Sequence, residues 1–184
     1  MIIPLAANEK AAQIPDDIKY SSALLTGSAH IQTYGDTNGT ITEKDGYETL
    51  VLGSRGKGKR LEAITLNFNN TTGYQGEIEY RVHRQTYGWT NWMKSTMQAG
   101  TVGQAKRLEG ITITVDNPKY SGGIRYKTHV QSFGWMNWAE NGELSGTYGR
   151  AKRLEAIQIE LTGEMKNHYD IYYRVHAQSF GWLG

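Results

Sequence analysis

The sequence contains no cysteine and only three prolines among its 184 residues. Without thiols the chain can form no disulfide, no thiolate nucleophile and no zinc–thiolate site. No run of residues approaches the roughly 18 apolar residues of a transmembrane helix. The chain also has no large excess of one charge, since it contains 20 Lys and Arg and 18 Asp and Glu. Since nucleic-acid binders normally carry a strong basic excess, we expect neither nucleic-acid binding nor membrane insertion.

Glycine and aromatic residues are abundant instead, with 22 Gly, 12 Tyr and 5 Trp. This composition suits short strands joined by tight turns, so it favours an all-β fold. Residues 1–20, with Pro4 and Pro15, are interpreted as an N-terminal extension or linker. The start has neither the basic segment nor the apolar core of a signal peptide. The chain is therefore either cytosolic or a fragment of a longer exported protein, and we favour the fragment.

A tandem repeat dominates the rest of the sequence. The pattern H-x-Q-S/T-Y/F-G begins at His30, His83, His129 and His176, and the last three copies continue with Trp89, Trp135 and Trp182. A second block, K-R-L-E-x-I, recurs about every 46 residues and contains Glu62, Glu109 and Glu155. Matches this long and this evenly spaced indicate repeated copies of one structural unit.

Alternation of apolar and polar residues places both blocks on β-strands. Ile78, Tyr80 and Val82 alternate with polar residues before one copy of the first block. Residues 111–115 alternate in the same way within the second block. Between the two blocks the sequence predicts a short strand, a turn and a return, so each repeat has three or four strands.

Three such repeats predict a closed, pseudo-threefold body, either a β-prism or a β-trefoil, whose final half-repeat can complete the first copy. A linear string of separate repeats is the alternative. We expect one domain over residues 21–184. Its parts are repeat 1 at 24–70, repeat 2 at 77–116, repeat 3 at 123–163 and partial repeat 4 at 170–184.

The repeated glutamates are expected to need a polar partner. Regular alternation puts Glu109 on the same face as Ile111, and a buried carboxylate without a partner would cost several kcal/mol. We therefore expect a structural polar contact within each repeat. Its members are His83, His129, His176, Glu62, Glu109, Glu155, Arg107 and Arg153.

The repeated aromatic and amide residues are typical of carbohydrate recognition. Aromatic rings stack on the C–H face of a sugar, and planar amides hydrogen-bond its hydroxyl groups. The predicted ligand-binding residues are Gln85, Tyr87, Trp89, Asn91, Trp92, Gln131, Phe133, Trp135, Asn137, Trp138, Gln178, Phe180 and Trp182. A tryptophan that occurs once per repeat can instead anchor the core. The Lys-Arg pairs of the second block are either solvated or attract anionic wall polymers such as teichoic acid.

The sequence does not indicate an enzyme. Glu109 and Glu155 occupy equivalent positions in two copies of one repeat, whereas a glycosidase pair needs two different environments. No G-x-S-x-G motif is present, and residues 56–59 lack the ending of a phosphate loop. His-x-Gln is not a metal motif, because Gln is a poor ligand. We expect no catalytic residues, no cofactor and no metal site.

Taken together, the repeated elements resemble the clostridial hydrophobic W (ChW) repeat. The matching pattern is I-x-Y-x-x-H-x-Q-x-x-G-W, then W, then G-T-x-G, then R-L-E-x-I-x-I, and it covers roughly residues 24–184. The first copy departs from the pattern, since Asp36 stands where the later copies have tryptophan, and the last copy stops after Trp182.

The resemblance implies an exported bacterial or phage module that attaches to the cell wall or its glycans. We therefore expect a secreted or cell-surface protein that binds peptidoglycan or a wall polysaccharide. It would be the targeting part of a phage endolysin, an autolysin or a related hydrolase, with a catalytic domain in the parent chain. A protein–protein interaction or adhesin module is the alternative.

Overall fold

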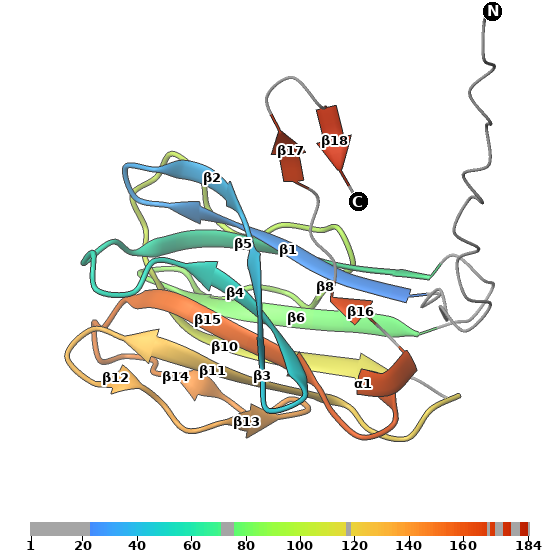
Figure 1. The fold of residues 1–184 in the computed structure, drawn as a ribbon. Coiled ribbons are helices and arrows are strands. Elements are labelled where there is room, and N and C mark those ends of the chain that lie inside the picture. The colour runs from blue at the N-terminus through green and yellow to red at the C-terminus, as the bar shows by residue number, and fades with distance from the viewer. Residues whose placement is uncertain are drawn as a thin grey trace, which may run out of the picture.

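Sheets of mostly antiparallel strands make up nearly all of the computed structural model (Figure 1), which describes residues 23–70, 76–116, 119–168, 170–171, 175–177 and 181–183. Across these ranges the only helix is α1, Met165–His168, with four residues. The prediction of an all-β fold is confirmed. No helix in this part of the chain is long and apolar enough to span a membrane. The predicted extension, residues 1–20, lies outside the described residues.

Three antiparallel pairs of long strands form the frame of the fold. They are β1 (Ala23–Ile31) with β5 (Leu61–Asn70), β6 (Glu77–Arg84) with β10 (Leu108–Asp116), and β11 (Ile124–Val130) with β15 (Leu154–Leu161). Residues of β11 alternate between buried and half-buried, as the period of two in the sequence predicts. Each pair joins the two repeated sequence blocks of one copy.

Each first long strand turns back into a short hairpin. β2 (Gly35–Asn38), β7 (Gly88–Trp89) and β12 (Gly134–Trp135) fold onto β1, β6 and β11. β8 (Met93–Lys94) and β13 (Ala139–Glu140) then pair further back along β6 and β11. In the second copy Thr86 and Gly88 both have positive φ, 74° and 68°, so the glycine before the tryptophan allows the tight turn.

The remaining strands of each copy pair with a different repeat. β9 (Ala99–Gly100) adds to β5, and β14 (Ser145–Gly146) adds to β10. The hairpin of β3 (Thr40–Lys44) and β4 (Tyr47–Gly53), which belongs to the first copy, adds to β15 of the third. From the final half-repeat, β16 (Asp170–Ile171) pairs in parallel with β1, while β17 (Val175–Ala177) and β18 (Gly181–Leu183) pair with each other.

Three glycines allow the backbones of neighbouring repeats to approach closely. Gly146 has φ of 101°, and a Cβ built there would lie 2.6 Å from the Glu109 carbonyl oxygen. Gly53 and Gly100 occupy the equivalent positions, and a Cβ at either would lie 2.4 Å from a glutamate carbonyl oxygen. The residue after Gly146, Thr147, donates its backbone N–H to that same Glu109 carbonyl at 2.7 Å. Only glycine fits here, which explains the first glycine of the repeated G-T-x-G motif.

The core is mainly aliphatic and contains two completely buried tyrosines. The Tyr126 hydroxyl accepts the backbone N–H of Ile113 at 2.9 Å and donates to the carbonyl of Glu143. Tyr80 makes the same pair of contacts one repeat earlier, accepting the N–H of Leu66 at 2.9 Å and donating to a turn carbonyl. Each tyrosine thus links its own repeat to the second long strand of the preceding one.

The close approach at Gly146 predicts that Gly146→Ala lowers the free energy of unfolding by at least about 2 kcal/mol, because the new Cβ clashes with backbone and alanine disfavours positive φ. Urea unfolding followed by circular dichroism measures the change. Gly149→Ala is the matched control, since Gly149 also has positive φ, 67°, but has no neighbouring atom within 4 Å of the added Cβ. Equal losses in both variants would contradict the packing argument.

Burial raises the pKa of Tyr126 to about 12, and the N–H bond from Ile113 partly opposes this rise. The pKa of an unfolded tyrosine is about 10. The buried neutral phenol therefore stabilises the fold fully below pH about 10, and this contribution is lost as the pH rises to about 12. We expect Tyr126→Phe to remove part of this alkaline loss of stability. Burial also raises the pKa of Tyr80, which accounts for another part.

At neutral pH we expect Tyr126→Phe to cost about 1–3 kcal/mol, since it leaves a buried N–H and a carbonyl without their partner. Urea unfolding at pH 7 and at stepped alkaline pH measures both effects. Tyr87→Phe, at a half-exposed hairpin tip, is the control. A Tyr126 variant that behaves like this control at both pH values would show that the hydroxyl does not hold the repeats together.

Candidate functional site

The tryptophans of the two central repeats lie outside the buried core, on the outer side of the sheets. In β6 the core residues alternate with outward residues that include Arg81 and His83. The Arg81 guanidinium carbon lies 4.9 Å from the ring centroid of Trp89 and 4.7 Å from that of Trp92. Trp92 remains 41% exposed, so a large part of its ring is accessible. Two aromatic rings thus flank one cation on the surface of repeat 2.

Repeat 3 has the same arrangement with a different cation. Lys127, at the position of Arg81, places its Nζ 5.4 Å from the centroid of Trp135 and 4.4 Å from that of Trp138. The guanidinium carbon of Arg125 lies 4.8 Å from the Trp138 centroid. Cation–π contacts of this kind stabilise the ring orientations, so these tryptophans are held in place although they are only half-buried.

The repeated histidine packs against the tryptophan of its own hairpin. The rings of His83 and Trp89 meet edge to face with centroids 5.4 Å apart, and those of His129 and Trp135 do the same. In the first copy Asp36 replaces the tryptophan, and its carboxylate lies 2.7 Å from Nδ1 of its histidine. The first copy therefore keeps the hairpin but exchanges an aromatic contact for a polar one.

The repeated glutamate sits at a β-bulge, where the register shifts between Leu108 and Gly110. The extra residue breaks the regular alternation that predicted Glu109 on the face of Ile111. Its carboxylate lies beside the outward-facing His83 instead, with Oε2 3.2 Å from Nδ1. The expected face was wrong because periodicity in the sequence does not reveal a bulge.

Arginine and histidine both contact the buried glutamates. Nε of Arg107 donates a hydrogen bond to Oε1 of Glu109 at 2.8 Å, and Nη2 of Arg107 lies 2.7 Å from the same oxygen. The histidine Nδ1 is within ion-pair distance but its geometry does not meet that of a hydrogen bond, so arginine is the main partner. The other copies pair Arg153 with Glu155 at 2.7 Å, His129 with Glu155 at 3.0 Å, and Arg60 with Glu62 at 2.8 Å.

The other predicted ligand residues lie at the hairpin tips or outside the described residues. Tyr87 and Phe133 are about half exposed at their tips, and a lysine Nζ lies 5.6 Å and 5.9 Å from their ring centroids. The backbone N–H groups of Gln85 and Gln131 brace the hairpins by donating to the backbone carbonyl oxygens of Arg107 and Arg153, at 2.9 and 3.0 Å. Exposed amides are found at Asn91 and Asn137. Of the last copy, Gln178 and Phe180 lie outside the described residues, and only the backbones of His176 and Trp182 are described, paired across β17 and β18.

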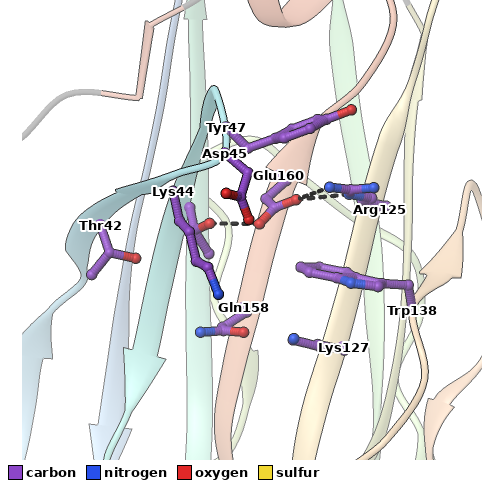
Figure 2. Close-up of a pocket in the computed structure, with 10 residues that line it drawn as sticks. Thr42, Lys44, Asp45, Tyr47, Arg125, Lys127, Trp138, Gln158 and Glu160 are labelled. Atoms are coloured by element: carbon purple, nitrogen blue, oxygen red, sulfur yellow. Dashed lines mark hydrogen bonds and ion pairs between the residues drawn. The ribbon is translucent and has the colours of Figure 1, made fainter.

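A pocket of about 270 Å³ lies where the β3–β4 hairpin of the first copy meets β11 and β15 of the third (Figure 2). The hairpin supplies Lys44, Asp45 and Tyr47, and the third repeat supplies Trp138 and Gln158. Sequence analysis predicted only Trp138 among these residues. The others were missed because they carry no repeated motif and come together only through the pairing of β4 with β15.

Charges in this pocket are partly compensated. The Glu160 carboxylate is buried and accepts hydrogen bonds from Arg125 Nε at 2.7 Å and from the Thr49 hydroxyl at 2.5 Å. Nη2 of Arg125 also lies 2.6 Å from this carboxylate. Arg125 also covers Tyr47, with its guanidinium carbon 4.1 Å from the ring centroid. In the ranges that the structure describes, no group of three or more His, Asp or Glu side chains is placed to hold a metal ion.

A family model described as clostridial hydrophobic W matches residues 83–117 and 129–163. The chain carries two ChW repeats. Each match begins at a motif histidine and includes the tryptophan pair and the bulged glutamate, whereas Arg81 and Lys127, which contact the tryptophans, come two residues before the matched ranges. ChW repeats are a repeat module not known to be catalytic and are associated with cell-wall-binding or surface modules. No curated protein and no solved structure matches the chain.

The contacts of the bulged glutamate predict that Glu155→Gln lowers the free energy of unfolding by about 1–3 kcal/mol, because it leaves a half-buried arginine without its carboxylate. Chemical denaturation followed by tryptophan fluorescence measures the loss. Glu43→Gln, on the exposed face of β3, should change stability by less than about 0.5 kcal/mol. A Glu155 variant as stable as the Glu43 variant would mean that the ion pair contributes nothing net.

Proposed function

We propose that this chain is a non-catalytic module that targets a bacterial cell wall by recognising peptidoglycan or a wall polysaccharide. The observation that carries the proposal is the position of Trp92 and Trp138, which lie on the outer surface, one of them 41% exposed and the other lining a pocket. A tryptophan needed only for packing would be buried in the core. The exposed ring of Trp92 suits the apolar face of a sugar.

Polar groups beside the rings fit the same ligand class. The exposed Asn91 precedes Trp92 directly, and Asn137 precedes Trp138. Each amide offers two donors and an acceptor, which match sugar hydroxyl groups. The cations that flank the rings fix their orientation before a ligand arrives, and such preorganisation lowers the entropic cost of binding.

We infer that the three repeats close into a pseudo-threefold body of the β-prism type. The pairing of β9 with β5, of β14 with β10 and of β4 with β15 supports this closure, since each second long strand gains a strand from another repeat. Equivalent outer faces would then be repeated around the body. Weak sites repeated in this way gain avidity on a polymeric wall.

A wall-targeting module of this kind suits a secreted protein of a bacterium or phage, attached to a catalytic domain such as that of an endolysin or autolysin. The association of ChW repeats with cell-wall-binding or surface modules supports this proposal. Binding a protein partner through strand addition is the second candidate, because β3 forms the edge of its sheet. The charged Glu43 and Lys44 on that edge count against it, since charges protect edge strands from pairing.

The proposal predicts that purified Gram-positive cell walls pull down the wild-type chain, and that Trp92→Ala/Trp138→Ala lowers the bound fraction at least about tenfold, because both accessible rings are lost. Walls before and after removal of wall polysaccharides separate the two glycan classes. Circular dichroism checks that the variant is folded.

The control for this experiment is Met97→Ala/Leu144→Ala, which removes two other exposed apolar side chains and should bind like wild type. A wild-type chain that stays in solution with every wall preparation would overturn the proposed function and favour a protein partner.

A further inference from the structure

We infer that the pocket between the β3–β4 hairpin and β11 binds a single saccharide unit that carries one acidic group. The inference rests on the proposed function, because it names the ligand class of the Trp138 site. At about 270 Å³ the pocket is close to the lower end of small-ligand pockets, which suits one saccharide unit rather than an oligomer.

The pocket belongs to the third repeat because of an asymmetry between the copies. The first copy contributes to β15 a hairpin with strands of five and seven residues. The second and third copies contribute strands of two residues each to β5 and β10. Side chains of the longer hairpin, including Lys44 and Asp45, line the pocket together with Trp138 (Figure 2).

One side of the pocket is a ladder of alternating cations and aromatic rings. Lys166 Nζ and the Arg125 guanidinium carbon each lie 4.1 Å from the Tyr47 centroid. Arg125 and Lys127 both contact the Trp138 ring, which lies between them in Figure 2. Because cations occupy the faces of Trp138, a ligand in the pocket meets positive charge as well as the ring.

Two of the pocket's cations are available for an anion. Arg125 is neutralised by Glu160, whereas within the described part of the chain neither Lys44 nor Lys127 forms an ion pair. Both lysines line the pocket together with Gln158, and in Figure 2 the amino end of Lys44 lies above the Gln158 amide and that of Lys127 to its right. An acidic group between them would accept hydrogen bonds from both amino groups and from the amide, and charge-assisted bonds of this type are strong.

The carboxylates of the pocket limit the ligand to one acidic group. Asp45 and Glu160 line the pocket together with the two lysines. Glu160 is compensated by Arg125, so it is Asp45 that would repel a second anionic group, whereas sugar hydroxyl groups would donate hydrogen bonds to Asp45. The side chains therefore match a ligand with one anionic end and several hydroxyl groups, as in an acidic monosaccharide.

Calorimetric titration of the full chain with three soluble probes tests the inference. The probes are N-acetylmuramic acid, which carries a carboxylate, N-acetylglucosamine 1-phosphate, which carries a phosphate, and neutral N-acetylglucosamine. We expect at least one acidic probe to bind at least about tenfold more tightly than the neutral sugar. Which acidic probe binds distinguishes a carboxylate from a phosphate as the recognised group, and added salt should weaken its binding.

Lys44→Gln and Lys127→Gln should each lower the affinity for the acidic probe about tenfold. Lys44 is exposed on the hairpin, so its replacement leaves the fold intact, and Lys127→Arg should keep most of the binding. Lys57→Gln is the control: it removes an exposed cation that does not line the pocket and should bind the probe like wild type.

Failure to bind either acidic probe, equal binding of the neutral sugar, or equal weakening by Lys57→Gln would each overturn the inference. The cell-wall pull-down separates this outcome from failure of the proposed function. A chain that binds walls but ignores the acidic probes keeps its proposed function and loses this pocket as the acidic-sugar site. A chain that binds an acidic probe through both lysines but not walls keeps the pocket and loses the wall as its target.

Discussion

The close contact between backbones at Gly53, Gly100 and Gly146 is the constraint on which the rest of the structure depends. A side chain at any of these positions would meet a glutamate carbonyl oxygen of the neighbouring repeat. Only because no Cβ is present can β4, β9 and β14 lie against the second long strands. That pairing in turn positions the turn carbonyls that Tyr80 and Tyr126 reach.

Local patterns predicted the repeats, the long strands and the need of the glutamates for polar partners. These features follow from residues close in sequence and from an alternation that every copy repeats. The bulge at Glu109 was not predicted, because one extra residue in a ladder leaves no mark on composition or spacing. The pocket was not predicted either. Lys44 and Tyr47 lie in the stretch of the first copy that has no counterpart in the others, and only long-range strand pairing brings them to Trp138.

The surface tryptophans lie outside the buried core, and cations contact their rings. Arg81 contacts two rings in repeat 2, and Lys127 contacts two in repeat 3. The same cations that support the rings also give the outer surface its positive character. Shape and charge at this surface are therefore coupled, and a substitution of either cation alters both.

The pairing of the first copy's hairpin with β15 also determines when the pocket can exist. Thr49 and Glu160, which hydrogen-bond beside the pocket, are 111 positions apart in the sequence. During synthesis the hairpin leaves the ribosome long before β15, so it remains unpaired with that strand while two further repeats are made. Contacts this distant slow folding. The pocket is consequently one of the last features to form, and its binding activity reports that the chain has folded through to the third repeat.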